Sequence, residues 1–186
     1  MPADPIAWTS ERFSKKYIAD YKPYNFVDGE GVRCSLYVSG CPFACKGCYN
    51  KAAQDFSYGE SYSEALEEQI VEDLKADYCQ GLTLLGGEPF LNTGVTLPLC
   101  HKIRDVFADT KDIWSWSGYT WEELMAGTED KRALLRVIDI LVDGRFEQDQ
   151  MDLNLAFRGS ANQRIIDVKQ SLASGEVILW KNGDYK

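Results

Sequence analysis

This sequence of 186 residues has no long apolar run, a single histidine and only six cysteines. No apolar stretch approaches the roughly 18 residues that cross a bilayer, so we expect no membrane-spanning helix. Residues 1–10 lack a basic segment followed by an apolar one, which predicts a cytoplasmic protein without a secretory leader. Six cysteines are too few for a disulfide scaffold, and no repeat or flexible linker divides the chain. The sequence therefore predicts a single domain over residues 1–186.

An excess of positive charge is missing too. The chain has 20 basic and 29 acidic residues, a formal net charge of −9 and a pI near 4.7. Such a chain repels phosphate backbones and anionic lipid surfaces at long range, so neither nucleic acid nor a membrane is an expected partner. What is present is a globular composition with 45% hydrophobic residues, enough to bury a substantial core.

Segments typical of strands alternate with segments typical of helices. Apolar alternation and short apolar runs predict strands at residues 31–38, 81–85, 112–117 and 137–142. Helical periodicity predicts helices at residues 62–77, 93–108, 120–125 and 128–136. This order is typical of parallel β-α-β units. Because a complete β/α barrel takes about 250 residues, the expected fold is α/β with a partial, incomplete parallel barrel, and an open sheet is the alternative.

Three of the six cysteines lie within eight residues, in a segment that we call the cysteine loop (residues 39–50). Cys41, Cys45 and Cys48 have the spacing C-x3-C-x2-C and follow the first expected strand. A structural zinc site usually takes four ligands, often as two close pairs, whereas a four-iron cluster held by three cysteines leaves one iron open to a substrate. The spacing therefore favours a four-iron four-sulfur cluster, with zinc or coincidental buried thiols as alternatives. The remaining candidate ligands are isolated in sequence and fit buried thiols or a helix surface: Cys34, Cys79, Cys100 and His101.

A second motif, the glycine turn (residues 86–89), follows the second expected strand. Its sequence Gly-Gly-Glu-Pro combines glycines that allow close backbone approach with a proline that holds Glu88 extended. A carboxylate and carbonyl oxygens there are suited to accept hydrogen bonds from an ammonium group. Ser117 ends the third expected strand and reaches the same edge in a parallel sheet. Taken alone the motif also fits an ordinary turn, and the nearby rings fit the core: Trp114, Trp116 and Tyr119.

Together the cysteine loop and the glycine turn resemble those of the radical S-adenosylmethionine enzymes. The resemblance implies that a four-iron four-sulfur cluster is bound by Cys41, Cys45 and Cys48. It also implies an S-adenosylmethionine site whose residues are Gly47, Tyr49, Gly86, Gly87, Glu88 and Ser117. Family members often have an aromatic residue before the third cysteine, whereas here Gly47 takes that place and Tyr49 follows the cysteine.

Further segments resemble a subgroup of this family that creates a glycyl radical on another protein. These segments are residues 29–33, 116–123, 139–146 and 158–168. The resemblance implies that one electron from a flavodoxin-type reductant cleaves S-adenosylmethionine and that the resulting 5′-deoxyadenosyl radical acts on a glycine Cα. The implied protein substrate is the large subunit of anaerobic ribonucleoside-triphosphate reductase. An incomplete barrel wall would leave the cluster open to a protruding loop of that subunit.

Two alternative functions stay open, and the charge distribution predicts one docking site for the reductant. The nearest alternative is another small enzyme of the family, such as an activator of pyruvate formate-lyase or a deazaguanine-forming enzyme. A non-catalytic iron-sulfur or zinc module is the alternative from another class. The first 50 residues carry a net charge of +1, so the reductant, which is generally acidic, is expected to dock there. The candidate contacts are Lys15, Lys16, Lys46 and Lys51.

Overall fold

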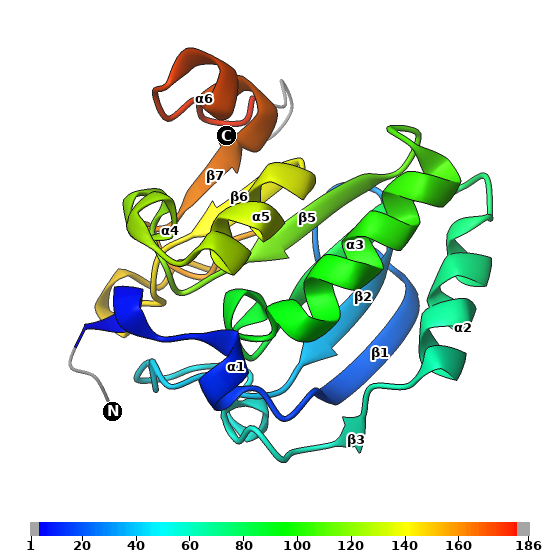
Figure 1. The fold of residues 1–186 in the computed structure, drawn as a ribbon. Helices are drawn as coiled ribbons and strands as arrows, with labels where there is room; N and C mark the ends of the chain where they lie inside the picture. Colours follow the sequence, from blue (N-terminus) through cyan, green and yellow to red (C-terminus); the bar gives the residue numbers. More distant parts are fainter. Residues whose placement is uncertain (1–3, 182–186) are drawn as a thin grey trace.

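The computed structural model describes residues 4–181, and its strands form one mixed sheet of seven strands in the order β3-β1-β2-β4-β5-β6-β7 (Figure 1). The strands are β1 (Tyr17–Asn25), β2 (Val32–Val38), β3 (Glu60–Ser61), β4 (Cys79–Gly86), β5 (Asp112–Trp116), β6 (Ile140–Asp143) and β7 (Arg164–Asp167). The α-helices are α1 (Ser10–Phe13), α2 (Glu64–Leu74), α3 (Thr93–Phe107), α4 (Trp121–Ala126), α5 (Glu129–Val137) and α6 (Val168–Ser174). Short 3-10 turns are η1 (Pro5–Ala7), η2 (Ala52–Gln54), η3 (Pro89–Leu91) and η4 (Gln148–Gln150). Every expected strand and helix is present, with ends displaced by a few residues.

The centre of the sheet is parallel, as the alternation of strands and helices predicts. β2 pairs with β4, β4 with β5, and β5 with β6, all in parallel. The carboxyl ends of these four strands therefore lie along one edge of the sheet. The crossover helices α2, α3 and α5 contribute to a single core with one face of the sheet (Figure 1). Within residues 4–181, every helix falls short of the length or apolar content that crossing a bilayer requires.

Both flanks of the sheet are antiparallel, and they are formed by strands that the sequence analysis does not predict. β1 pairs antiparallel with β2 because the connection, residues 26–31, is too short for the crossover that a parallel pair needs. β7 pairs antiparallel with β6, and the intervening residues 144–163 contain no α-helix. The sheet is open, with β3 and β7 at its two ends. The α/β class is confirmed, while the partial barrel stays a prediction.

Side chains of β2 alternate between the two faces of the sheet. Cys34, Leu36 and Val38 are buried in the core beneath the helices. On the opposite face, Trp114 of β5 packs with a smaller apolar group that includes Phe157 and Trp180. This second face is thus covered by the segment before β7 and by residues after α6.

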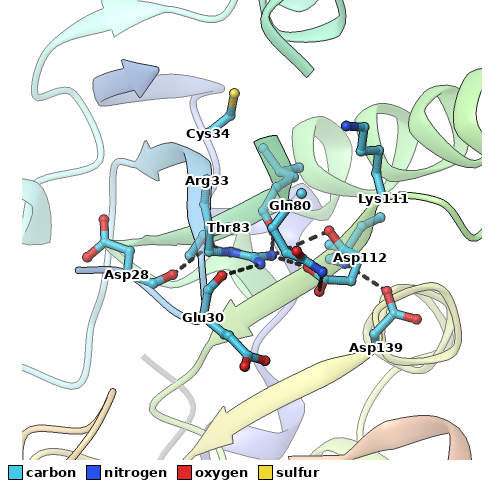
Figure 2. A network of polar contacts seen from close by, with 12 residues as sticks. Asp28, Glu30, Arg33, Cys34, Gln80, Thr83, Lys111, Asp112 and Asp139 are labelled. Carbon is cyan, nitrogen blue, oxygen red and sulfur yellow. Dashed lines mark hydrogen bonds and ion pairs between the residues drawn. The ribbon is translucent and has the colours of Figure 1, made fainter. Parts of the chain in front are cut away.

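A buried arginine organises the second face (Figure 2). The Arg33 side chain is fully buried, its Nε donates to Thr83 Oγ1 over 2.7 Å, and its Nη2 donates to Asp112 Oδ1 over 2.5 Å. The guanidinium also lies 5.3 Å from the ring centroid of Trp114. Thr83 Oγ1 in turn donates to the carbonyl oxygen of Asp28 over 2.7 Å. The network therefore fixes the β1–β2 connection against β4 and β5.

Candidate functional site

A cavity of about 420 Å³ lies where the four parallel strands end. Its walls come from the cysteine loop after β2, the glycine turn after β4, residues 116–118 at the end of β5, and residues 144 and 146 after β6. A further wall comes from the segment before β7, through residues 155 and 157–159. Ligands of open α/β sheets bind at this edge, so the cavity is the natural candidate site.

The cysteine loop turns back on itself immediately after β2. Gly40 N donates to Ala53 O over 2.7 Å and Cys41 N donates to Gln54 O over 3.1 Å, so the start of the loop is held against η2. Gly40 has a φ of +102°, and a Cβ there would lie 1.9 Å from the Phe56 ring. Only glycine fits this position, which sets the direction in which the loop leaves the strand.

All three cysteines of the motif line the cavity and are half-buried. Burial is the largest cause that raises the pKa of the Cys41 and Cys45 thiols, because the thiolate loses hydration there. A bound cation offsets that penalty, so soft thiolates in this position suit a metal centre. Within residues 4–181, no three histidine, cysteine or acidic side chains meet closely enough to hold one metal ion. In a four-iron cluster each cysteine binds a different iron, so three thiols that line one cavity are compatible with that group.

Phe43 anchors the cysteine loop between its first two cysteines. Its ring centroid lies 4.9 Å from that of Tyr119 in an edge-on contact and 5.3 Å from that of Trp8. The Arg145 guanidinium stacks on the same ring at 4.4 Å and forms an ion pair with Glu123 over 2.9 Å. These contacts tie the loop to the segments after β5 and β6.

The glycine turn lies directly against the cysteine loop. Gly87 N donates to Val38 O over 2.7 Å, and Glu88 N donates to Gly40 O over 2.9 Å. A Cβ at Gly87 would lie 2.7 Å from Gly40 O, and one at Gly86 would lie 2.8 Å from Val38 O. The expected close backbone approach is therefore present, and its partner within the chain is the end of β2.

Glu88 is fully buried, and its carboxylate joins two of the site's segments. Its Oε1 accepts from Phe90 N over 3.0 Å and from Ser117 Oγ over 2.9 Å, and its Oε2 accepts from Gly118 N over 2.8 Å. Burial nevertheless raises the pKa of Glu88 to about 7, and the hydrogen bonds oppose the shift. The carboxylate lines the cavity while already holding three donors of the chain.

The structure brings together most of the residues that the sequence assigns to the cofactor site. Cavity-lining members of that set are Cys41, Cys45, Cys48, Tyr49, Gly86, Gly87, Glu88 and Ser117. Gly47 lies outside the lining; it has a φ of +78°, and a Cβ there would lie 3.3 Å from the Phe146 ring. Tyr49 contacts the same ring edge-on, with centroids 5.8 Å apart.

The cavity lining also includes residues that the sequence analysis does not assign to the cofactor site. Asp28 comes from the β1–β2 connection, and its carboxylate accepts from the Tyr37 hydroxyl over 2.5 Å. Trp116 belongs to the lining rather than only to the core, and its Nε1 donates to Phe157 O over 3.0 Å. Arg158 comes from the segment before β7 and is half-buried. Each reaches the cavity through contacts between segments far apart in the sequence.

Arg158 is the only lysine or arginine among the described residues that line the cavity. Its Nη1 donates to Gln163 O over 2.9 Å. Its Nε is buried and has no hydrogen-bond partner within residues 4–181. The cavity thus combines one cationic side chain with three thiols and two carboxylates.

The isolated residues lie away from the cavity, as the sequence predicts. Cys34, Cys79 and Cys100 are buried in the core, and His101 is exposed on α3. Trp114 and Tyr119 are buried core aromatics. The four candidate docking lysines are exposed: Lys15, Lys16, Lys46 and Lys51.

Comparison with known proteins links this site to one family. Residues 27–166 match the model of a 4Fe-4S single cluster domain. The chain is 49% identical over 149 residues to the anaerobic ribonucleoside-triphosphate reductase-activating protein of Pasteurella multocida (strain Pm70), covering 78% of this chain and 93% of that protein. It is 42% identical over 147 residues to the protein of the same name from Escherichia coli (strain K12), covering 77% and 93%. The protein of that name from Enterobacteria phage T4 is 34% identical over 145 residues, covering 77% and 88%.

Proposed function

The chain belongs to the family of anaerobic ribonucleoside-triphosphate reductase-activating proteins, and from this membership we propose that it creates a glycyl radical on the large subunit of such a reductase. The observation that carries the proposal is the convergence of the cysteine loop, the glycine turn and Ser117 on one cavity. The proposed enzyme class is a radical S-adenosylmethionine oxidoreductase built on a partial β/α barrel.

Cys41, Cys45 and Cys48 are the residues that would hold a four-iron four-sulfur cluster, leaving one iron without a protein ligand. When bound, the cluster supplies the single electron that splits S-adenosylmethionine into methionine and a 5′-deoxyadenosyl radical. Phe43 keeps the loop fixed through its contacts with Trp8, Tyr119 and Arg145. Side chains of this chain therefore position the thiols and shield them from water, and the redox chemistry belongs to the group that they bind.

S-adenosylmethionine is assigned to the cavity beside the cysteines, against Gly86, Gly87, Glu88 and Ser117. Glu88 fixes the glycine turn against residues 117–118, which gives the cavity a rigid polar wall. This wall offers oxygen acceptors to the amino group of the methionine moiety. Gly47 and Tyr49 belong to the same proposed site at the far end of the cysteine loop.

Arg158 is the residue that we assign to the carboxylate of S-adenosylmethionine. It is the one cation among the described cavity-lining residues, and its buried Nε has no acceptor within residues 4–181. A guanidinium with unused donors matches a carboxylate in charge and in planar geometry.

The rim of the cavity suits a protein substrate. Phe26 and Val27 are 73% and 69% exposed on the β1–β2 connection, and Leu153 is 82% exposed on the segment before β7. Val27 itself lines the cavity. Exposed apolar side chains beside a candidate site are typical of a surface that a partner covers. The open rim therefore supports entry of a loop of the reductase, whose glycine Cα would give up one hydrogen atom to the deoxyadenosyl radical.

The test combines the anaerobically reconstituted chain, S-adenosylmethionine, a reductant and the large subunit of an anaerobic ribonucleoside-triphosphate reductase. Electron paramagnetic resonance should show a glycyl radical on the large subunit, and no such signal with pyruvate formate-lyase as the substrate protein. A radical on pyruvate formate-lyase alone would assign the chain to the other activator. Loss of iron in a Cys34→Ala, Cys79→Ala or Cys100→Ala variant, with normal folding, would favour a closed module with a fourth ligand.

A further inference from the structure

Two cysteines outside the cavity form a close pair. Cys34 of β2 and Cys79 of β4 have their Sγ atoms 3.7 Å apart. Their exposed fractions are 0% and 1%. Figure 2 shows the Cys34 side chain directed away from the Arg33 guanidinium, toward the face of the sheet that the helices cover. The pair is thus separate from both the cavity and the arginine network.

The backbone around the pair is held firmly. β2 and β4 are parallel neighbours in which Val32 lies opposite Cys79 and Cys34 lies opposite Leu82, with an irregularity after Val32. Lys111 Nζ donates to the carbonyl oxygen of Cys79 over 2.7 Å. The two sulfurs therefore stay near each other whenever the sheet is formed, and side-chain rotation must close the remaining gap to a disulfide length of about 2.05 Å.

The two thiols affect each other's pKa. Their mutual contact is the largest cause that lowers the pKa of Cys79, and burial partly opposes it. The Cys79 hydrogen bond and burial both raise the pKa of Cys34. The thiolate is the reactive form of cysteine, and whichever sulfur is oxidised first has the other within 3.7 Å to resolve the product.

We propose that Cys34 and Cys79 form a redox modification site that becomes a reversible disulfide on exposure to hydrogen peroxide or a comparable small peroxide. One thiol of the pair loses its proton and attacks a peroxide oxygen, the O–O bond breaks, and the leaving hydroxide takes up that proton, so a sulfenic acid and one water form. The other thiol then displaces the sulfenic oxygen as a second water, and the S–S bond forms. Both sulfurs are oxidised and both peroxide oxygens are reduced, so two thiols and one peroxide give one disulfide and two waters.

The position of the pair gives the disulfide a structural consequence. β2 leads into the cysteine loop and β4 leads into the glycine turn. A covalent link near the amino ends of these strands fixes the register of β2 against β4 in a chain that has lost its metal to the oxidant. The link also constrains the unfolded chain, so the oxidised, metal-free protein should show a thermal midpoint several degrees above that of the reduced one. Formation of this disulfide does not depend on the proposed function.

The experiment treats the reconstituted holoprotein with hydrogen peroxide, blocks free thiols by alkylation, and maps peptides by mass spectrometry. We expect a linked Cys34–Cys79 peptide that accumulates with peroxide and disappears after dithiothreitol. The peptide should persist in Cys100→Ala, which removes another buried thiol, and be absent from Cys34→Ala. Absorbance of the cluster is followed in parallel, so loss of metal and formation of the disulfide are scored separately.

Two results would overturn the proposal. One is recovery of both residues as alkylated thiols after peroxide has oxidised other cysteines of the same sample. The other is a Cys79 peptide carrying sulfinic or sulfonic acid without any linked peptide. Both readouts come from the unmodified sequence, so they remain decisive even where a cysteine variant fails to fold.

Discussion

The hydroxyl of Ser117 donates a hydrogen bond to Glu88 Oε1 over 2.9 Å, joining the end of β5 to the turn after β4. With Gly118 N on Oε2, this contact makes a buried carboxylate the link between two cavity walls. Such a carboxylate is costly to bury and stabilises the fold only while its donors remain in place. Replacing Glu88 therefore tests whether this carboxylate holds the two cavity walls together.

Glu88→Gln should destabilise the fold and weaken the cavity. The amide keeps one acceptor oxygen but turns an NH2 group toward a donor of the chain, so at least one buried hydrogen bond is lost. We expect a cost of about 1–3 kcal/mol in the free energy of unfolding at pH 8, where the carboxylate is ionised. Urea denaturation measures it, and Glu122→Gln, whose side chain is 61% exposed, is the matched control with little expected change. Equal stabilities for the two variants would contradict the bridging role.

The same variant should change the pH dependence of stability. Burial raises the pKa of Glu88 to about 7 in the folded state, against about 4.3 for an exposed glutamate. Because the pKa is higher in the folded state, the contribution of Glu88 to folding stability is fully present below the unfolded pKa and is lost as the pH rises to 7. At about 1.4 kcal/mol for each pKa unit, this loss of stability amounts to roughly 3 kcal/mol. Glu88→Gln should remove this slope between pH 4.5 and 7; an unchanged slope would show that other groups cause it.

Gly87→Ala should separate the glycine turn from the cysteine loop. The added Cβ would lie 2.7 Å from Gly40 O and 2.8 Å from Gly40 N, both backbone atoms that cannot move aside easily. We expect a loss of about 1–3 kcal/mol in stability and poorer retention of iron. Gly94→Ala is the control, because the nearest atom to its Cβ is Lys16 Cε at 3.5 Å. This control should be neutral or slightly stabilising within α3, and comparable losses in both variants would contradict the steric explanation.

Arg158→Lys should weaken the binding of S-adenosylmethionine without removing the cluster. Lysine keeps the charge but cannot present two parallel donors to a carboxylate. Loss of a charge-assisted hydrogen bond costs about 1.5–3 kcal/mol, which corresponds to a dissociation constant raised about tenfold or more. Equilibrium binding measures the effect, and absorbance of the reconstituted cluster shows that the cysteine loop is intact. An unchanged dissociation constant would place the carboxylate elsewhere.

Charge reversal at Lys46 and Lys51 should slow reduction by an acidic flavodoxin. Both residues are exposed at the cysteine loop or just after it. Electrostatic attraction acts mainly on the association rate, so the loss should be several-fold at low salt and should shrink as salt increases. Reduction by dithionite should be unaffected by the double variant. Equal losses with flavodoxin and dithionite would reject docking at these lysines.

The parallel centre of the fold could be predicted because each of its strands is a short apolar segment between helices. β1 carries no such signal: Pro23 and several exposed side chains interrupt its alternation, since only part of the strand faces the core. β7 has four residues, too few to show a period. The antiparallel flanks follow from these two strands, so the sequence pattern alone could not predict them.

The candidate site, too, could be predicted only in part from the sequence. Cys41, Cys45 and Cys48 are close in sequence, so their spacing alone indicates shared chemistry. Arg158 lies in the segment before β7, and Trp116 contacts that segment through Phe157 O; neither contact leaves a local sequence pattern. Glu88 could be identified as a site residue, but its burial and its three donors depend on how β4 and β5 pair.

The proposed function depends above all on Cys41, Cys45 and Cys48 holding a cluster at which this chain cleaves S-adenosylmethionine. The decisive measurement is the amount of 5′-deoxyadenosine formed by the anaerobically reconstituted chain with S-adenosylmethionine and dithionite. We expect product from the natural sequence and from Cys100→Ala, and none from Cys41→Ala. A chain that carries its full complement of iron and sulfide and still forms no 5′-deoxyadenosine would refute the proposed function.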